Sequence, residues 1–173
     1  MRRILLILLP LGCLAQEFGP VSSPKLKILD LNFRVEDLGG KVEDLRVKES
    51  TTEVRVEMAA DILFDFDKAI IKPQADAALH QLSALIVSRG KGNVRIEGYT
   101  DAKGSDLHNQ NLSLRRAESV RSWLAEKSAI DWARMTAEGM GAKNPVAPNT
   151  KPDGSDDPDG RQRNRRVEIV IAK

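Results

Sequence analysis

The sequence has little that would support disulfide, thiol or metal chemistry. Cys13 is the only cysteine, so a disulfide within the chain is excluded and the core must hold the fold together. His80 and His108 are the only histidines, and neither has a cysteine or a second histidine at a metal-ligand spacing. A Ser-His-Asp order, a phosphate-binding glycine loop and a zinc signature are all missing. We therefore predict a protein that is not an enzyme and uses no metal or cofactor.

Charge of one sign and aromatic residues are also scarce. Lys and Arg number 27 against 25 Asp and Glu, and a net charge of +2 gives no reason to expect nucleic acid or an acidic membrane surface as a partner. Of the 173 residues 41% are hydrophobic and only 4% are aromatic. This is enough apolar material for one domain of ordinary size with an extension, so any recognition through charge must be local.

Residues 1–15 predict a secretory signal peptide, because two arginines precede an apolar run that ends in small residues. The run is too short to span a bilayer as a helix. Two processing routes remain open. Gly12-Cys13 resembles a lipoprotein processing site, at which Cys13 would be lipidated, whereas cleavage after Ala15 would remove the cysteine. Either route predicts an exported chain.

The remaining chain divides into three segments by composition. Residues 16–27 are rich in glycine, proline and serine and predict a linker. Residues 28–54 alternate between apolar and polar side chains on both sides of Gly39-Gly40, which predicts a small β-hairpin or meander, the N-terminal β extension. Residues 55–173 then predict the main domain.

Within the main domain, strand and helix patterns alternate. A helix is expected from Lys72-Pro73 to Arg89-Gly90, and a second helix from Asn109, as its cap, to about Lys127. Strands are expected near residues 61–66, 93–99, 135–138 and 166–171. The order β-α-β-α-β-β predicts an α+β fold, a two-layer sandwich with its helices packed on one face of a mixed sheet.

Four segments of the main domain, taken together, carry a family resemblance. In order and spacing they resemble the OmpA-like domain of outer membrane porin tails, peptidoglycan-associated lipoproteins and flagellar stator proteins. The segments are Ile62 to Lys68 with Ile71 and Pro73, Ile96 to Asp101 with Gly104, Asn109 through Leu112-Ser113 to Arg116-Ala117, and Gly160-Arg161 followed by Asn164 to Glu168.

The resemblance implies non-covalent binding of peptidoglycan through the diaminopimelate of its stem peptide, in the periplasm or at the cell outer membrane. The free end of diaminopimelate carries an ammonium and a carboxylate on one carbon, so a receptor needs an acid and a base a few ångströms apart. Asp101 and Arg116 match the acid and the base of the family, and arginine suits a carboxylate because its planar fork donates two parallel hydrogen bonds. The other positions implied by the resemblance are Asp67, Asn109, Asn164, Arg165 and the backbone near Thr100 and Leu112.

Two features depart from the family pattern. Tyr99 stands where the family often has histidine, and we expect it to alter the floor of the site. Residues 149–160, here called the acidic loop, are longer and more acidic than the usual link to Gly160-Arg161, and we expect a solvated, flexible loop. Oxygen-bearing residues alternate in it as in calcium loops, but Pro158 occupies the place of the required glycine, so no metal is predicted.

Two alternatives to wall binding stay open. The chain would be an envelope adaptor if its site were vestigial and residues 28–54 paired with an outer-membrane or envelope protein. It would be a peptidoglycan-acting enzyme if Asp65, Asp67 and Asp101 served as acid-base carboxylates. The sequence offers no nucleophile or metal set to support the enzyme.

Overall fold

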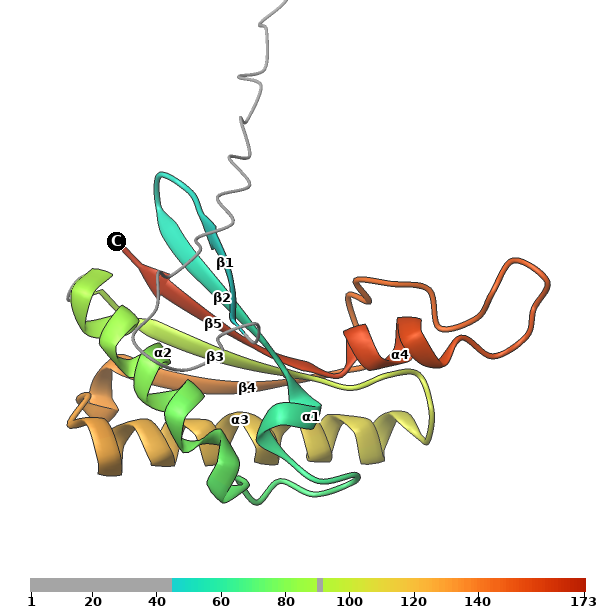
Figure 1. The fold of residues 1–173 in the computed structure, drawn as a ribbon, viewed down its shortest axis with the longest axis horizontal. Coiled ribbons are helices and arrows are strands. Elements are labelled where there is room, and N and C mark those ends of the chain that lie inside the picture. Colours follow the sequence, from blue (N-terminus) through green and yellow to red (C-terminus); the bar gives the residue numbers. More distant parts are fainter. Residues whose placement is uncertain (1–44, 90–91) are drawn as a thin grey trace, which may run out of the picture.

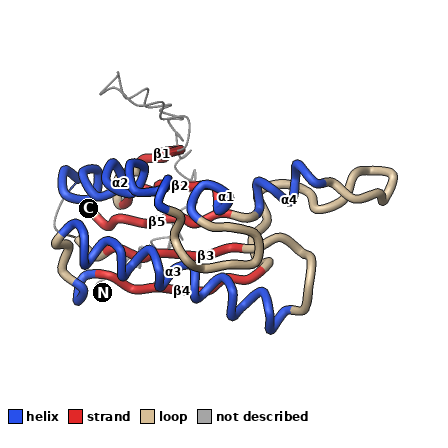
Figure 2. The backbone as a smooth tube through the Cα atoms, turned by 60° about the horizontal axis from the view of Figure 1, so that its bottom comes forward, coloured by secondary structure: helices blue, strands red, loops and turns tan. Residues whose placement is uncertain are grey.

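The computed structural model describes residues 45–89 and 92–173. They form a five-stranded sheet with the long helices on one face, as Figures 1 and 2 show. The strand order is β1-β2-β5-β3-β4; β3 and β4 are parallel and the other neighbours antiparallel, so the sheet is mixed. The α+β prediction is confirmed. The strands are β1 (Leu45–Glu49), β2 (Glu53–Ala59), β3 (Val94–Tyr99), β4 (Met135–Gly141) and β5 (Arg166–Ala172).

The N-terminal hairpin is part of the main sheet. Strand β2 pairs with β1 on one side and, along its full length, with β5 on the other. Its inward residues Val54, Val56 and Met58 are fully buried. The expected domain boundary at residue 55 therefore falls inside a strand of the domain. The signal peptide, both routes for Cys13, the linker 16–27 and most of the extension 28–54 lie outside the described residues.

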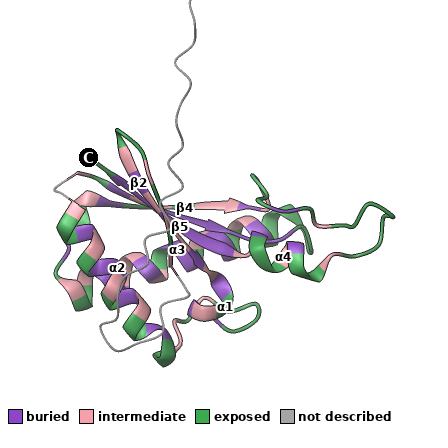
Figure 3. Ribbon diagram, turned by 45° about the horizontal axis from the view of Figure 1, so that its top comes forward, coloured by how far each residue is buried: buried purple, intermediate pink, exposed green. Residues whose placement is uncertain are grey.

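Helices α2 (Asp76–Arg89) and α3 (Asp106–Ser128) cover one face of the sheet. Helix α3 presents Ala117, Val120 and Leu124 inward at the expected helical spacing, and Figure 3 shows the buried residues gathered between the two layers. No helix within the described ranges is both long and apolar enough to cross a membrane. The shorter helices are α1 (Ala60–Leu63), η1 (Pro73–Ala75), η2 (Trp132–Arg134) and α4 (Pro158–Asn164).

Two expected elements differ from the structure. The predicted strand near residues 61–66 is wrong: the chain leaves the sheet at Ala59, which pairs with the first residue of β5, and turns into α1 because its strand partner ends there. The second helix begins at Asp106 rather than Asn109. Ser105 is its cap and accepts a hydrogen bond from the amide of His108 at 3.2 Å, so the side chain of Asn109 is free for other contacts.

The end of the acidic loop is helical rather than flexible. Asp157 caps α4 by accepting a hydrogen bond from the Gly160 amide at 3.0 Å, and Pro158 occupies the first turn, where its missing N–H costs nothing. This pair of residues was the sequence signal for α4. The expectation of a flexible loop is therefore wrong for residues 158–160.

Glycine lets α3 lie directly on the backbone of the sheet. A Cβ placed on Gly98 would be 2.1 Å from the carbonyl oxygen of Ser113, and one on the neighbouring Gly139 would be 2.7 Å from that of Gln110. The hydroxyl of Ser113 also accepts a hydrogen bond from the amide of Gly141 at 2.9 Å. The close approach fixes α3 against the end of β3. The contact residues Gly98 and Ser113 each stand three positions before a candidate site residue, Asp101 and Arg116 respectively.

The other face of the sheet carries a buried charge network that includes Tyr99. Its hydroxyl donates to Glu97 at 2.7 Å, and the guanidinium of Arg166 lies 3.8 Å from its ring centroid. Tyr99 thus belongs to the face without helices, so its expected place in the floor of the site is wrong. Burial acts to raise the pKa of Glu97, but hydrogen bonds from Tyr99 and Arg95 and the charge of Arg55 outweigh it and hold this pKa below its usual value.

Tyr99→Phe is expected to lower the free energy of unfolding by about 2 kcal/mol at neutral pH, because a hydrogen bond to a charged acceptor is lost. The depressed pKa of Glu97 contributes stability that is present above its ordinary value of 4.5 and is lost as the pH falls through its folded value. The variant raises that pKa, so the difference from wild type should shrink in acid. Urea unfolding measured between neutral pH and acid checks this, and a constant difference would contradict it.

Candidate functional site

The candidate site lies at one end of the sheet, where several chain segments meet. Ala59 at the end of β2 pairs with Arg166 at the start of β5, and Gly98 near the end of β3 pairs with Val167. The residues that follow β2, follow β3 and precede β5 are therefore neighbours. Helix α3 passes over this end through the glycine contact.

Asp101 is buried and already paired in the ligand-free protein. Its side chain is 10% exposed, and Oδ1 accepts a hydrogen bond from the amide of Lys103 at 3.0 Å. Oδ2 lies 2.9 Å from Nη1 of Arg165 and 3.6 Å from Nη1 of Arg161. Arg165 also pairs with Asp61 at 3.1 Å. The carboxylate of Asp101 is thus hydrogen-bonded to one guanidinium group, and a second lies nearby beyond hydrogen-bond distance.

Arg116 is more deeply buried and less well paired. It is 3% exposed; its Nε donates to the carbonyl of Lys68 at 2.9 Å, and its guanidinium lies 5.3 Å from the ring centroid of Phe64. Its Nη1 atom is buried without a hydrogen-bond partner among the described residues. Burial lowers the pKa of the guanidinium, and the charges of Asp61, Asp67 and Asp101 offset part of that effect. An anion would satisfy this cation.

Thr100 carries a second unsatisfied group at the same end of the sheet. Its hydroxyl is buried and has no partner within residues 45–89 and 92–173. Its amide, in contrast, donates to the carbonyl of Gly141 at 2.8 Å. Leu112 is buried beyond the first four residues of α3, the only ones whose amides lack an acceptor within the helix. The hydroxyl of Thr100, rather than either amide, is the group left for a ligand.

Asn109 and Asn164 use their amide groups to hold loops. Nδ2 of Asn109 donates to the carbonyls of Asp101 and Lys103 at 3.4 and 3.0 Å. Oδ1 of Asn164 accepts from the amides of Val146 and Ala147, and its Nδ2 donates to the carbonyl of Ala147 and to Oδ1 of Asn149. Both residues hold the loops around the site in place, and their direct contact with a ligand stays a prediction.

Asp67 stands at the rim of the site. Its φ of 56° lies in the left-handed region, which aspartate tolerates better than most residues, and its side chain is 51% exposed. Oδ1 lies 2.8 Å from Nε2 of His108, which ties the loop before α2 to the first turn of α3. The loop and the helix therefore border the site together.

Arg161 and Asp61 were not expected in the site. Arg161 stands four residues before Arg165, so a helix places both on one face. The sequence signal was the Asp157-Pro158 start of α4, which makes this spacing meaningful. Asp61 had been assigned to a strand, and its place near Arg165 follows only from the turn of α1.

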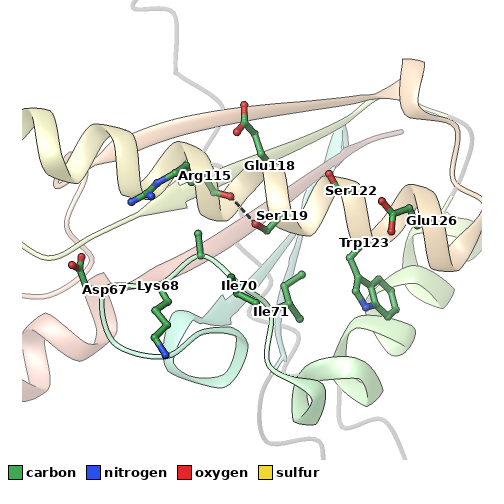
Figure 4. A pocket seen from close by; sticks show the side chains of 11 residues that line it. Asp67, Lys68, Ile70, Ile71, Arg115, Glu118, Ser119, Ser122, Trp123 and Glu126 are labelled. Carbon is green, nitrogen blue, oxygen red and sulfur yellow. Dashed lines mark hydrogen bonds between the residues drawn. The ribbon is translucent and has the colours of Figure 1, made fainter.

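A groove opens beside the rim, with a cavity volume of about 710 Å³ between the loop at residues 67–71 and α3. Figure 4 shows Ile70 and Ile71 on the loop, Ile70 below Ser119 of α3 and Ile71 beside the side chain of Trp123. Asp67 lines the groove, whereas Asp101 and Arg116 do not. The groove is thus a neighbour of the charged site. No three His, Cys, Asp or Glu side chains of the described residues are grouped to hold a metal ion.

Comparison with known proteins places this geometry in a family. A model described as the OmpA family matches residues 63–158, which is more than half of the chain. The chain belongs to the OmpA family. The match spans the segments from the end of α1 to the start of α4, so it includes Asp101 and Arg116. Domains of this family associate with peptidoglycan and anchor envelope components.

Three of the proteins that this chain resembles are of different kinds. Photosystem I P700 chlorophyll a apoprotein A2 of Gloeobacter violaceus is 46% identical over 136 residues, 79% of this chain and 16% of that protein. Outer membrane protein A of Escherichia fergusonii is 45% identical over 95 residues, 54% of this chain and 39% of that protein. The solved structure of the cell wall anchor of the T6SS from Pseudomonas aeruginosa has a TM-score of 0.64 at 28% identity, covering 75% of this chain and 87% of that one. The match therefore spans well under half the length of the photosystem apoprotein and of outer membrane protein A.

Proposed function

We propose that this chain binds peptidoglycan non-covalently through the diaminopimelate of the stem peptide and so anchors the outer membrane or an envelope complex to the cell wall. The observation that carries the proposal is the unsatisfied Nη1 of the buried Arg116, at the same end of the sheet as the buried acid Asp101. Buried polar atoms are rarely left unpaired, so such a group indicates a missing partner.

The two charges of the ligand would enter the site differently. The carboxylate would meet Nη1 of Arg116 and the hydroxyl of Thr100, which have no hydrogen-bond partner among the described residues. The ammonium would take the place of Arg165 at Asp101, and Arg165 would keep its second partner, Asp61. Binding on the ammonium side is thus an exchange of one cation for another.

The exchange limits the affinity. A hydrogen bond to a charged group contributes about 1.5–3 kcal/mol net, but displacing Arg165 and ordering a flexible stem each offset part of that gain. We therefore expect a dissociation constant in the micromolar range, which corresponds to a binding free energy of about 8 kcal/mol. The rest of the stem peptide would extend from the site past Asp67 and lie in the groove along α3.

Export and attachment follow from the N-terminal predictions. A signal peptide at residues 1–15 would deliver the chain to the periplasm, and lipidation of Cys13 would tether it to the outer membrane. Acid-base catalysis has less support, because Asp101 is paired with Arg165 and Asp65 forms an exposed ion pair with Lys68. We therefore propose that the chain is not an enzyme.

Sedimentation of the purified full chain with insoluble peptidoglycan tests the function. Diaminopimelate-type wall should bind the chain, and lysine-type wall should bind it at least about tenfold more weakly, because the carboxylate that faces Arg116 is gone. Equal sedimentation with both walls would overturn the proposed specificity. Release of soluble wall fragments would support the enzyme instead.

A further inference from the structure

We propose that Asp156 of the acidic loop sets the affinity of the site for the ammonium of the ligand, by holding Arg161 away from Asp101. The inference rests on the proposed function and adds a positioning residue to it. It gives a role to the loop that distinguishes this chain from the family pattern, and Figure 1 shows that loop projecting from the end of the sheet beside α4.

Arg161 lies between two carboxylates and is bound mainly to one of them. Its Nε and Nη2 atoms donate to the two carboxylate oxygens of Asp156, at 2.9 and 2.5 Å. Its remaining Nη1 is 3.6 Å from Oδ2 of Asp101, beyond a good hydrogen bond. The side chain of Arg161 is 12% exposed, so it has little room to turn toward water. Two N–H groups of the Arg161 guanidinium therefore bind Asp156, and only Nη1 is near Asp101.

Asp156 is held in position by the loop and by the β3–α3 connection. It forms a β-bridge with Thr150 across the acidic loop, and its carboxylate is 3.6 Å from Nζ of Lys103. The amide of Ala102 donates to Oδ1 of Asn149 at 3.2 Å, which joins the base of the loop to the segment that carries Asp101. The base of the acidic loop is therefore held beside the site.

Loss of the charge on Asp156 would release Arg161 toward Asp101. Asp101 would then be paired with Arg161 and Arg165 together, and an incoming ammonium would have to displace both guanidinium groups. Arginine forms its strongest ion pairs when two N–H groups meet one carboxylate, and Asp156 now occupies those two groups. Asp156 thus keeps Asp101 available to the ligand.

Isothermal titration of the full chain with a soluble stem tripeptide that ends in diaminopimelate tests this role. Asp156→Asn should bind the tripeptide about tenfold more weakly than wild type, and Asp156→Glu should retain most of the affinity. Removing Arg161 as well, in Asp156→Asn/Arg161→Gln, should restore the affinity to within about twofold of Arg161→Gln alone. A tripeptide acetylated on the distal amine should bind wild type and Asp156→Asn equally, because no ammonium competes.

The matched control is Asp153→Asn, which removes an acid of the same loop whose carboxylate accepts hydrogen bonds from Ser155. It should bind as wild type does. Wild-type affinity in Asp156→Asn, or no recovery in the double variant, would overturn the role of Asp156 and leave the proposed function standing. Failure of the wild-type chain to bind the tripeptide would overturn both.

Discussion

Arg116→Met is expected to reduce binding of the stem tripeptide by more than about 100-fold while leaving the protein at least as stable as wild type. The binding loss follows from two charge-assisted hydrogen bonds, each contributing roughly 1.5–3 kcal/mol. The stability gain has a different cause: burial lowers the pKa of Arg116, so its charged form is held in the fold at a cost. A buried donor without a partner costs about 1–3 kcal/mol, and methionine removes it while filling similar space.

Titration calorimetry and thermal unfolding of the same samples check both parts of this result. Lys127→Met is the matched control, because Lys127 is an exposed cation on the same helix that does not line the groove and should change neither quantity much. A variant that binds normally would remove Arg116 from the site. A variant that loses more than about 2 kcal/mol of stability would show that Arg116 serves the fold instead.

Gly98→Ala is expected to cost roughly 3–5 kcal/mol of unfolding free energy, a large share of the 5–15 kcal/mol typical of a domain. The added methyl group would lie 2.1 Å from the Ser113 carbonyl oxygen and 2.8 Å from its carbon, and both atoms belong to the backbone of α3. Neither can move aside as a flexible side chain would. Helix α3 must therefore shift as a body, which would also part Arg116 from Asp101.

Urea unfolding of Gly98→Ala beside Gly154→Ala separates packing from backbone effects. Gly154 has a φ of +83° and nothing within 4 Å of an added Cβ, so its substitution carries the conformational penalty alone, about 1 kcal/mol. A loss at Gly98 no larger than that at Gly154 would contradict the close approach of α3.

Periodicity was sufficient for the larger elements of the fold. The buried positions of α3 at Ala117, Val120 and Leu124 and the alternation in β2 are visible in the sequence, and the order of helix and strand patterns led to the α+β class that the structure confirms. The short elements depend on where a strand runs out of partners. Residues 61–66 look like a strand in isolation, and only the end of β5 opposite Ala59 turns them away from the sheet.

The sequence named candidate site residues, but the bonds between them could not be predicted from it. Asp101 and Arg116 were identified from a family resemblance, and the structure places both at one end of the sheet, buried. The pairing of Asp101 with Arg165 and Arg161 depends on how α4 packs, which no local pattern reveals. Tyr99, in contrast, could have been placed from a local pattern, because the alternation of β3 assigns it to the face of Glu97, opposite the helices.

The burial of Asp101 and Arg116 determines how binding through them would depend on salt concentration. Dissolved salt screens exposed charges over about 10 Å at 0.1 M but weakens buried pairs much less. The whole residues are only 8% and 3% exposed. Binding through these two residues would therefore persist when the salt concentration outside the cell rises, whereas binding through exposed surface lysines would be lost.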